Sequence, residues 1–140
     1  MSAFYINELL VRLLPRGVPE QALFKSYYET LKKLASGEEP LVTLRYFELD
    51  FLNALGYGLP EGPFPASRYR FVVGDLIASD NTALENAGVS SDTLRALISR
   101  TLQPGEQERE ARMLTRDLIG YYLEEIPLNT RRILNELKKI

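Results

Sequence analysis

The stretch LRYFELDFLNALGYG, residues 44–58, decides the fold. Its apolar side chains recur at the three- and four-residue spacing of a helix with one buried face. Pro40 suits the first turn of such a helix, and Gly56 is typical of the residue that ends one. The stretch therefore predicts a helix over residues 40–55, and it places a cation, Arg45, directly beside the apolar stripe.

Helical patterns also occupy most of the remaining chain. They cover residues 3–14 and 19–35, a short segment that begins at Ser90 or Ser91, residues 104–123, and a last segment after Pro127 capped by Asn129 or Thr130. Short connections between helices favour antiparallel neighbours. We therefore expect a mainly α protein, a single helical-bundle domain of about six helices spanning residues 1–140.

One region breaks the helical pattern. Residues 56–67 hold three glycines and three prolines, a density that excludes regular structure. Residues 68–79 are rich in β-branched and aromatic side chains around Gly74-Asp75, which is typical of a small β-hairpin. A two-stranded hairpin is marginal alone, so this insert after the third helix should lie on the helices.

The composition excludes several classes of function. The 140 residues contain no cysteine and no histidine, which removes disulfides, thiolate nucleophiles, imidazole bases and the usual zinc ligands. There is no calcium-binding or phosphate-binding loop motif, so we expect no metal and no cofactor. The chain lacks a signal peptide and a membrane-spanning apolar run, and the absence of cysteine is compatible with the cytoplasm. A net charge of −2 gives no overall basic field for nucleic acid.

Four segments in order resemble the bacterial RecO recombination mediators. FYINELLVRLLP at 4–15 is similar to the first helix of that family's C-terminal helical domain, and LRYFELDFLNALGYG to its signature helix and turn. YRFVVGDLIAS at 69–79 resembles the short β segment that follows, and LTRDLIGYYLEEIPLNTRRIL at 114–134 resembles the closing pair of helices.

Three features depart from that family. RecO proteins begin with an oligonucleotide-binding barrel that this chain does not supply, which predicts an excised or truncated relative. Many members hold a four-cysteine zinc site after the signature turn, whereas the loop here has no cysteine. Asn129 stands where a lysine is common.

The resemblance implies a function and a set of partners. It implies a non-enzymatic domain that binds the C-terminal tail of single-stranded DNA-binding protein, works with RecR and assists the loading of the RecA recombinase during DNA recombination and repair. DNA itself would bind weakly, chiefly through the missing N-terminal domain. Two other functions stay open from the residues alone: a small hydrolase that uses carboxylates beside the hairpin, and a purely structural interaction domain.

Arg45 is the candidate contact for the partner's tail. On a helix it shares a face with Glu48, Leu49 and Leu52, next to the apolar stripe. A guanidinium at the edge of an apolar groove can bind a terminal carboxylate while the groove takes an aromatic ring. By the resemblance, Arg45 with Leu49 and Leu52 would bind the tail of single-stranded DNA-binding protein. The alternative is that Arg45 is a solvated side chain with its stem on apolar surface, which simply pairs with Glu48 or Asp50 on its own helix.

Arg131 and Arg132 are the candidate DNA contacts, because the resembling motif places basic residues at the start of the last helix. The alternative is that the cations of this segment serve only to stabilise its own helix.

Overall fold

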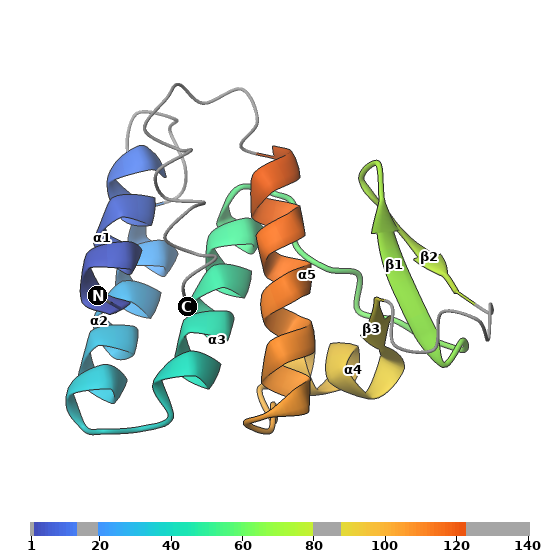
Figure 1. Ribbon diagram of the computed structural model, residues 1–140. Coiled ribbons are helices and arrows are strands. Elements are labelled where there is room, and N and C mark those ends of the chain that lie inside the picture. The colour runs from blue at the N-terminus through green and yellow to red at the C-terminus, as the bar shows by residue number, and fades with distance from the viewer. Residues whose placement is uncertain (1, 14–19, 80–87, 123–140) are drawn as a thin grey trace.

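The computed structural model describes residues 2–13, 20–79 and 88–122. In chain order its elements are α1 (Ser2–Leu13), α2 (Glu20–Ala35), α3 (Pro40–Ala54), β1 (Arg68–Val72), β2 (Asp75–Ala78), β3 (Val89–Ser90), α4 (Ser91–Ser99) and α5 (Glu106–Tyr122) (Figure 1). The prediction of a mainly α fold with a small β insert after the third helix is confirmed. The last predicted helix lies outside the described residues, which contain five of the six helices expected.

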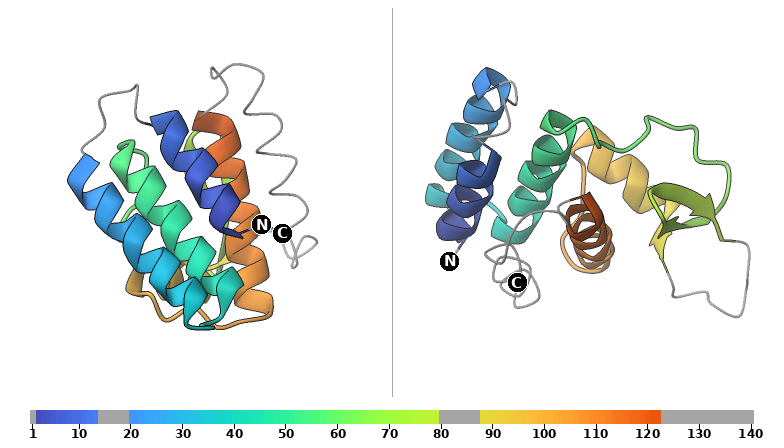
Figure 2. Two further views of the ribbon diagram at one scale, coloured as in Figure 1. Left: turned by 90° about the vertical axis from the view of Figure 1, so that its left-hand side faces the viewer. Right: turned by 90° about the horizontal axis from the view of Figure 1, so that it is seen from above.

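Helix α3 occupies the centre of the bundle. It packs against α1 and α2 on one side and α5 on the other, and the views in Figure 2 show it between these neighbours. Nine of its fifteen residues are consequently buried, including polar ones. The main core gathers apolar side chains from all these helices and from the sheet: Tyr5, Ile6, Leu9, Leu23, Leu44, Phe47, Phe51, Leu52, Phe64, Tyr69, Val89, Leu94, Leu114, Leu118 and Ile119.

The sheet lies on the far side of α5 from α1 and α2 (Figure 1). Its strand order is β2-β1-β3, and both pairings are antiparallel. The hairpin β1–β2 turns through Val73 and Gly74, whose φ angles of 44° and 90° are both positive. Such angles match the twist of a two-residue hairpin, but they strain a β-branched residue such as valine.

The sequence did not predict β3. This strand pairs only Val89 and Ser90 with the start of β1. A strand of two residues is too short to show the alternation of apolar and polar side chains from which strands are predicted. Of the two serines predicted as the helix cap, Ser90 is the cap, since its hydroxyl accepts a hydrogen bond of 3.1 Å from the Thr93 N–H at the start of α4.

Individual side chains depart from the predicted stripes. Val11, an apolar residue within the segment predicted as the first helix, is 59% exposed. None of the helices in the described part of the chain combines the length and hydrophobicity needed to cross a bilayer.

Candidate functional site

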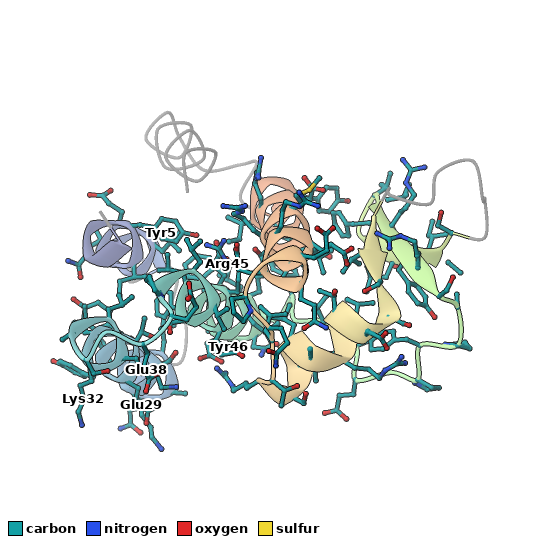
Figure 3. The ribbon with its side chains drawn as sticks, turned by 60° about the horizontal axis from the view of Figure 1, so that its bottom comes forward. Tyr5, Glu29, Lys32, Glu38, Arg45 and Tyr46 are labelled. Carbon is teal, nitrogen blue, oxygen red and sulfur yellow. The ribbon has the colours of Figure 1, made fainter. Side chains whose placement is uncertain are left out.

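Arg45 lies inside the bundle, between α3 and α5 (Figure 3). Its exposed fraction is 0%, and its Nη1 donates a hydrogen bond of 2.9 Å to Oε2 of Glu108 on α5. Its Nε also lies 2.6 Å from Oε1 of Glu48, one helical turn along α3. That second contact is an ion pair without hydrogen-bond alignment, because the Nε–H finds no acceptor among the described residues. The guanidinium therefore sits between two buried carboxylates.

The same carboxylates connect a third helix to this centre. Glu48 accepts hydrogen bonds from the Tyr5 hydroxyl of α1 at 2.6 Å and from the Thr115 hydroxyl of α5 at 2.9 Å. Complete burial, followed by the negative charge and hydrogen bond of Glu48, raises the pKa of Tyr5 well above its ordinary value. We call Tyr5, Arg45, Glu48, Glu108 and Thr115 the interior network; it ties α1, α3 and α5 together.

This geometry contradicts the predicted tail-binding groove at Arg45. The guanidinium is closed off from solvent and already faces two carboxylates, so a partner's terminal carboxylate cannot reach it. Leu49 and Leu52, the predicted groove wall, are 5% and 0% exposed. The physical reason is that α3 is covered on several faces, so the face beside the apolar stripe is also interior. Of the alternative prediction, the pair between Arg45 and Glu48 is confirmed, whereas the solvated position of the side chain is wrong, because Arg45 is fully buried.

The sequence pattern missed Glu108 as the main partner of Arg45. Acidic residues in the first turn of a helix such as α5 are expected for the helix N-terminus alone, which favours negative charge. A readable signal existed, because Glu108 precedes buried Ala111 by three residues and buried Thr115 by seven, which is the spacing of one helix face. An acid on one buried stripe and an arginine on another indicate a pair across the helix interface.

Glu110 forms a second polar cluster, at the junction of the sheet with α4 and α5. It accepts hydrogen bonds from the Ser90 N–H (2.9 Å), the Thr93 hydroxyl (2.9 Å) and Arg68 (3.2 Å). Burial, the largest single effect, would raise the pKa of Glu110, but these three donors together lower it. The cluster fixes β1 and β3 to the helices.

An accessible groove does exist on the signature helix, at its contact with α2. It has a volume of about 500 Å³ and is lined by Ala22, Leu23, Lys25, Ser26, Glu29, Asp50, Asn53 and Ala54. We call it the α2–α3 groove. Asp50 in its wall accepts a hydrogen bond from Ser26 and forms an ion pair with Arg100. Lys25 forms no salt bridge with any described residue, so its charge is available at the rim.

Arg131 and Arg132, the predicted DNA contacts, lie outside the described residues. Among residues 2–13, 20–79 and 88–122, no three acidic side chains gather as a metal site would require.

The sequence was compared with known protein families and relatives. The family model described as "Recombination protein O C terminal" matches residues 1–132. Similar curated proteins, each named DNA repair protein RecO, come from Nitrosococcus oceani (37% identical), Nitrosospira multiformis (31%) and an Azoarcus species (34%). These alignments cover 100% of this chain but 61%, 62% and 63% of the relatives, so the chain spans about three fifths of their length. No solved structure gives a significant match.

Proposed function

Because this chain belongs to the RecO family through that family's C-terminal domain, we propose that it is the helical module of a cytoplasmic DNA recombination and repair mediator. It acts by binding rather than by catalysis. It binds the acidic, phenylalanine-ending tail of single-stranded DNA-binding protein and, with RecR, assists the loading of RecA. The observation that carries the proposal is the family match over residues 1–132.

The α2–α3 groove is the surface that best suits such a tail. Ala22, Leu23 and Ala54 give it apolar lining that can receive an aromatic ring. Lys25 at the rim offers a positive charge to the terminal carboxylate. The negative charge of Asp50 is already compensated by Arg100, which leaves Glu29 as the acid that opposes an acidic peptide.

A peptide with several acidic residues followed by a terminal phenylalanine tests this site by fluorescence anisotropy. We expect micromolar binding that weakens as salt rises. Lys25→Ala should weaken binding about threefold to fivefold, since an exposed charge pair is worth up to about 1 kcal/mol. Glu29→Gln should strengthen it by removing a repulsive charge.

The matched control is Lys32→Ala, which removes an exposed lysine of the same helix that does not line the groove. Equal affinities for Lys25→Ala and Lys32→Ala would remove the groove from the proposal. A peptide that does not bind the unaltered chain at all would overturn the tail-binding function itself.

Arg131 and Arg132 are proposed to contribute phosphate contacts to weak DNA binding. Each neutralised phosphate contributes about −0.7 to the slope of log K against log salt for single strands. The double variant Arg131→Ala/Arg132→Ala should therefore flatten the slope by about one unit or more. An unchanged slope would mean that these arginines make no contact with phosphates.

A further inference from the structure

Helix α4 ends on a residue that is unusual for its backbone conformation. Arg100 has φ and ψ angles of 59° and 42°, which is the left-handed conformation. The Thr101 N–H then donates a hydrogen bond of 2.8 Å back to the Ala96 carbonyl, which closes the helix in the way that glycine or asparagine normally allows. Because an arginine adopts this conformation only at an energetic cost, the position points to a role for its side chain.

The side chain of Arg100 reaches across to α3. Its Nη2 forms an ion pair with Oδ1 of Asp50, and its guanidinium lies over the ring of Tyr46, 5.4 Å from the ring centre. Tyr46 and Asp50 are one turn apart on α3, so both can contact the same guanidinium. Oδ2 of Asp50 accepts a hydrogen bond from the Ser26 hydroxyl of α2. Asp50 therefore connects Arg100 to the wall of the α2–α3 groove.

Arg100 can still bind a second acid. Its side chain is 44% exposed, and its Nε and Nη1 donate to no residue in the described part of the chain. A guanidinium carries five N–H donors in one plane, so it can hold a carboxylate on more than one edge. Both oxygens of Asp50, by contrast, are engaged, one by Arg100 and one by Ser26. An incoming anion at this place therefore meets an accessible cation next to an acid that is already satisfied.

The α2–α3 groove has an apolar end and a polar end. Helices α2 and α3 are joined by a short turn and run in opposite directions, so the start of α2 lies beside the end of α3 (Figure 1). The apolar lining is together at that end: Ala22, Leu23 and Ala54. Glu29 and Asp50 lie toward the other end, and Arg100 borders it beyond Asp50. A peptide that lies along the groove with its ring at the apolar end brings its preceding residues toward Arg100.

We propose that Arg100 binds an acidic side chain of the tail and thereby selects peptides that carry an acid at one position. This inference rests on the function proposed above and assigns a further residue to the same site. The guanidinium lies between the levels of Tyr46 and Asp50, about six residues or about 9 Å along α3 from Ala54. An extended peptide spans about 3.3 Å per residue, so the third residue before the terminal phenylalanine is the one that reaches Arg100.

The charges of the two walls direct that acid toward α3. Glu29, an exposed acid on the α2 wall, repels an acidic side chain at this level, whereas Arg100 attracts it from the α3 side. The guanidinium is already partly neutralised by Asp50. The contact should therefore contribute preference for the position of the acid more than overall affinity.

Two peptides of identical composition and charge test the position. Both derive from Asp-Asp-Asp-Ser-Gly-Phe, labelled at its N-terminus and with a free C-terminal carboxylate. The near probe has asparagine in place of the aspartate three residues before phenylalanine, and the far probe has asparagine in place of the first aspartate. By fluorescence anisotropy with the 140-residue chain, we expect the near probe to bind about threefold to fivefold more weakly than the far probe.

Variants at position 100 test whether Arg100 causes that preference. Arg100→Gly removes the guanidinium and suits the left-handed backbone, so relieved strain offsets the lost ion pair and the urea midpoint should change little. The preference for the far probe should disappear or reverse, because Asp50 is then no longer neutralised and repels the aspartate. Arg100→Asn, which also tolerates this conformation, provides a second uncharged variant with the same expected result.

Two matched variants keep Arg100. Lys25→Ala should weaken both probes by the same factor, since Lys25 faces the terminal carboxylate that they share. Arg95→Ala removes another arginine of α4, which pairs with Asp92 on its own helix, and it should change neither the affinities nor the preference.

The outcomes separate this inference from the function on which it rests. The assignment of Arg100 is overturned, and tail binding stands, if the two probes bind the unaltered chain alike or if the preference persists in both Arg100→Gly and Arg100→Asn. If neither the parent peptide nor the probes bind the unaltered chain, the tail-binding function is overturned and the assignment of Arg100 with it.

Discussion

Replacing Arg45 by methionine tests whether the interior network exists in solution. Methionine keeps an unbranched apolar stem of similar length but removes the cation. Glu48 is then buried without a positive partner, and Glu108 keeps only the longer contact with Arg112, whose Nε lies 3.7 Å from its Oε2. Breaking one side of a buried ion pair costs about 3–5 kcal/mol. Against a total stability of about 5–15 kcal/mol for a domain, such a loss is large.

The assay is urea unfolding followed by circular dichroism. For an m value of about 1.5 kcal/mol per molar, the expected loss lowers the urea midpoint by about 2–3 M. Arg45→Lys retains the charge and should lose less stability than Arg45→Met, because it lacks only the planar guanidinium that reaches both carboxylates. If Arg45→Met is too unstable to show a folded baseline, Arg45→Lys supplies the measurement.

A triple variant separates charge from packing. Arg45→Met combined with Glu48→Gln and Glu108→Gln removes all three charges, and it should recover most of the stability lost by Arg45→Met alone. The reasoning is refuted if Arg45→Met unfolds within about 0.5 M urea of the unaltered chain, a shift typical of surface substitutions. A folded triple variant that binds the tail peptide as well as the unaltered chain would also confirm that Arg45 makes no direct contact with the partner.

Three further substitutions address single features of the fold. Glu110→Gln should destabilise the domain at neutral pH. This deficit should shrink as the pH falls from about 4.3, the ordinary pKa of a glutamate, through the lowered pKa of the folded state, because a carboxyl with a lowered folded pKa contributes stability only while it is ionised; unfolding at pH 3 and pH 7 measures the difference. Asp117→Asn should have the opposite effect on stability. Because the folded pKa of Asp117 is raised, its ionised carboxyl destabilises the fold as pH rises, so the variant should be more stable than the unaltered chain at pH 7 and not at pH 3. Val73→Asn should raise the free energy of unfolding by about 1 kcal/mol, because asparagine tolerates the positive φ that strains valine, and an unchanged thermal midpoint would contradict it.

The elements that the sequence predicts well are those specified by neighbouring residues. The periodicity of residues 40–55 predicts α3, and the turn residues around Gly74 predict the hairpin. Ser90 is recognisable as a cap because the N–H groups it satisfies belong to the next few residues. In each case the interaction that decides the structure lies within one or two turns of the residue concerned.

Arg45 shows where that reasoning fails. Its nearer carboxylate, Glu48, is one turn away and was foreseen, whereas its hydrogen-bonded partner Glu108 lies 63 residues later on another helix. Nothing in the spacing of α3 distinguishes a cation at a groove rim from a cation beneath a neighbouring helix. The position of α5 decides between them, and it is set by packing over the whole bundle. The pairing of β3 with β1 is likewise non-local and was missed for the same reason.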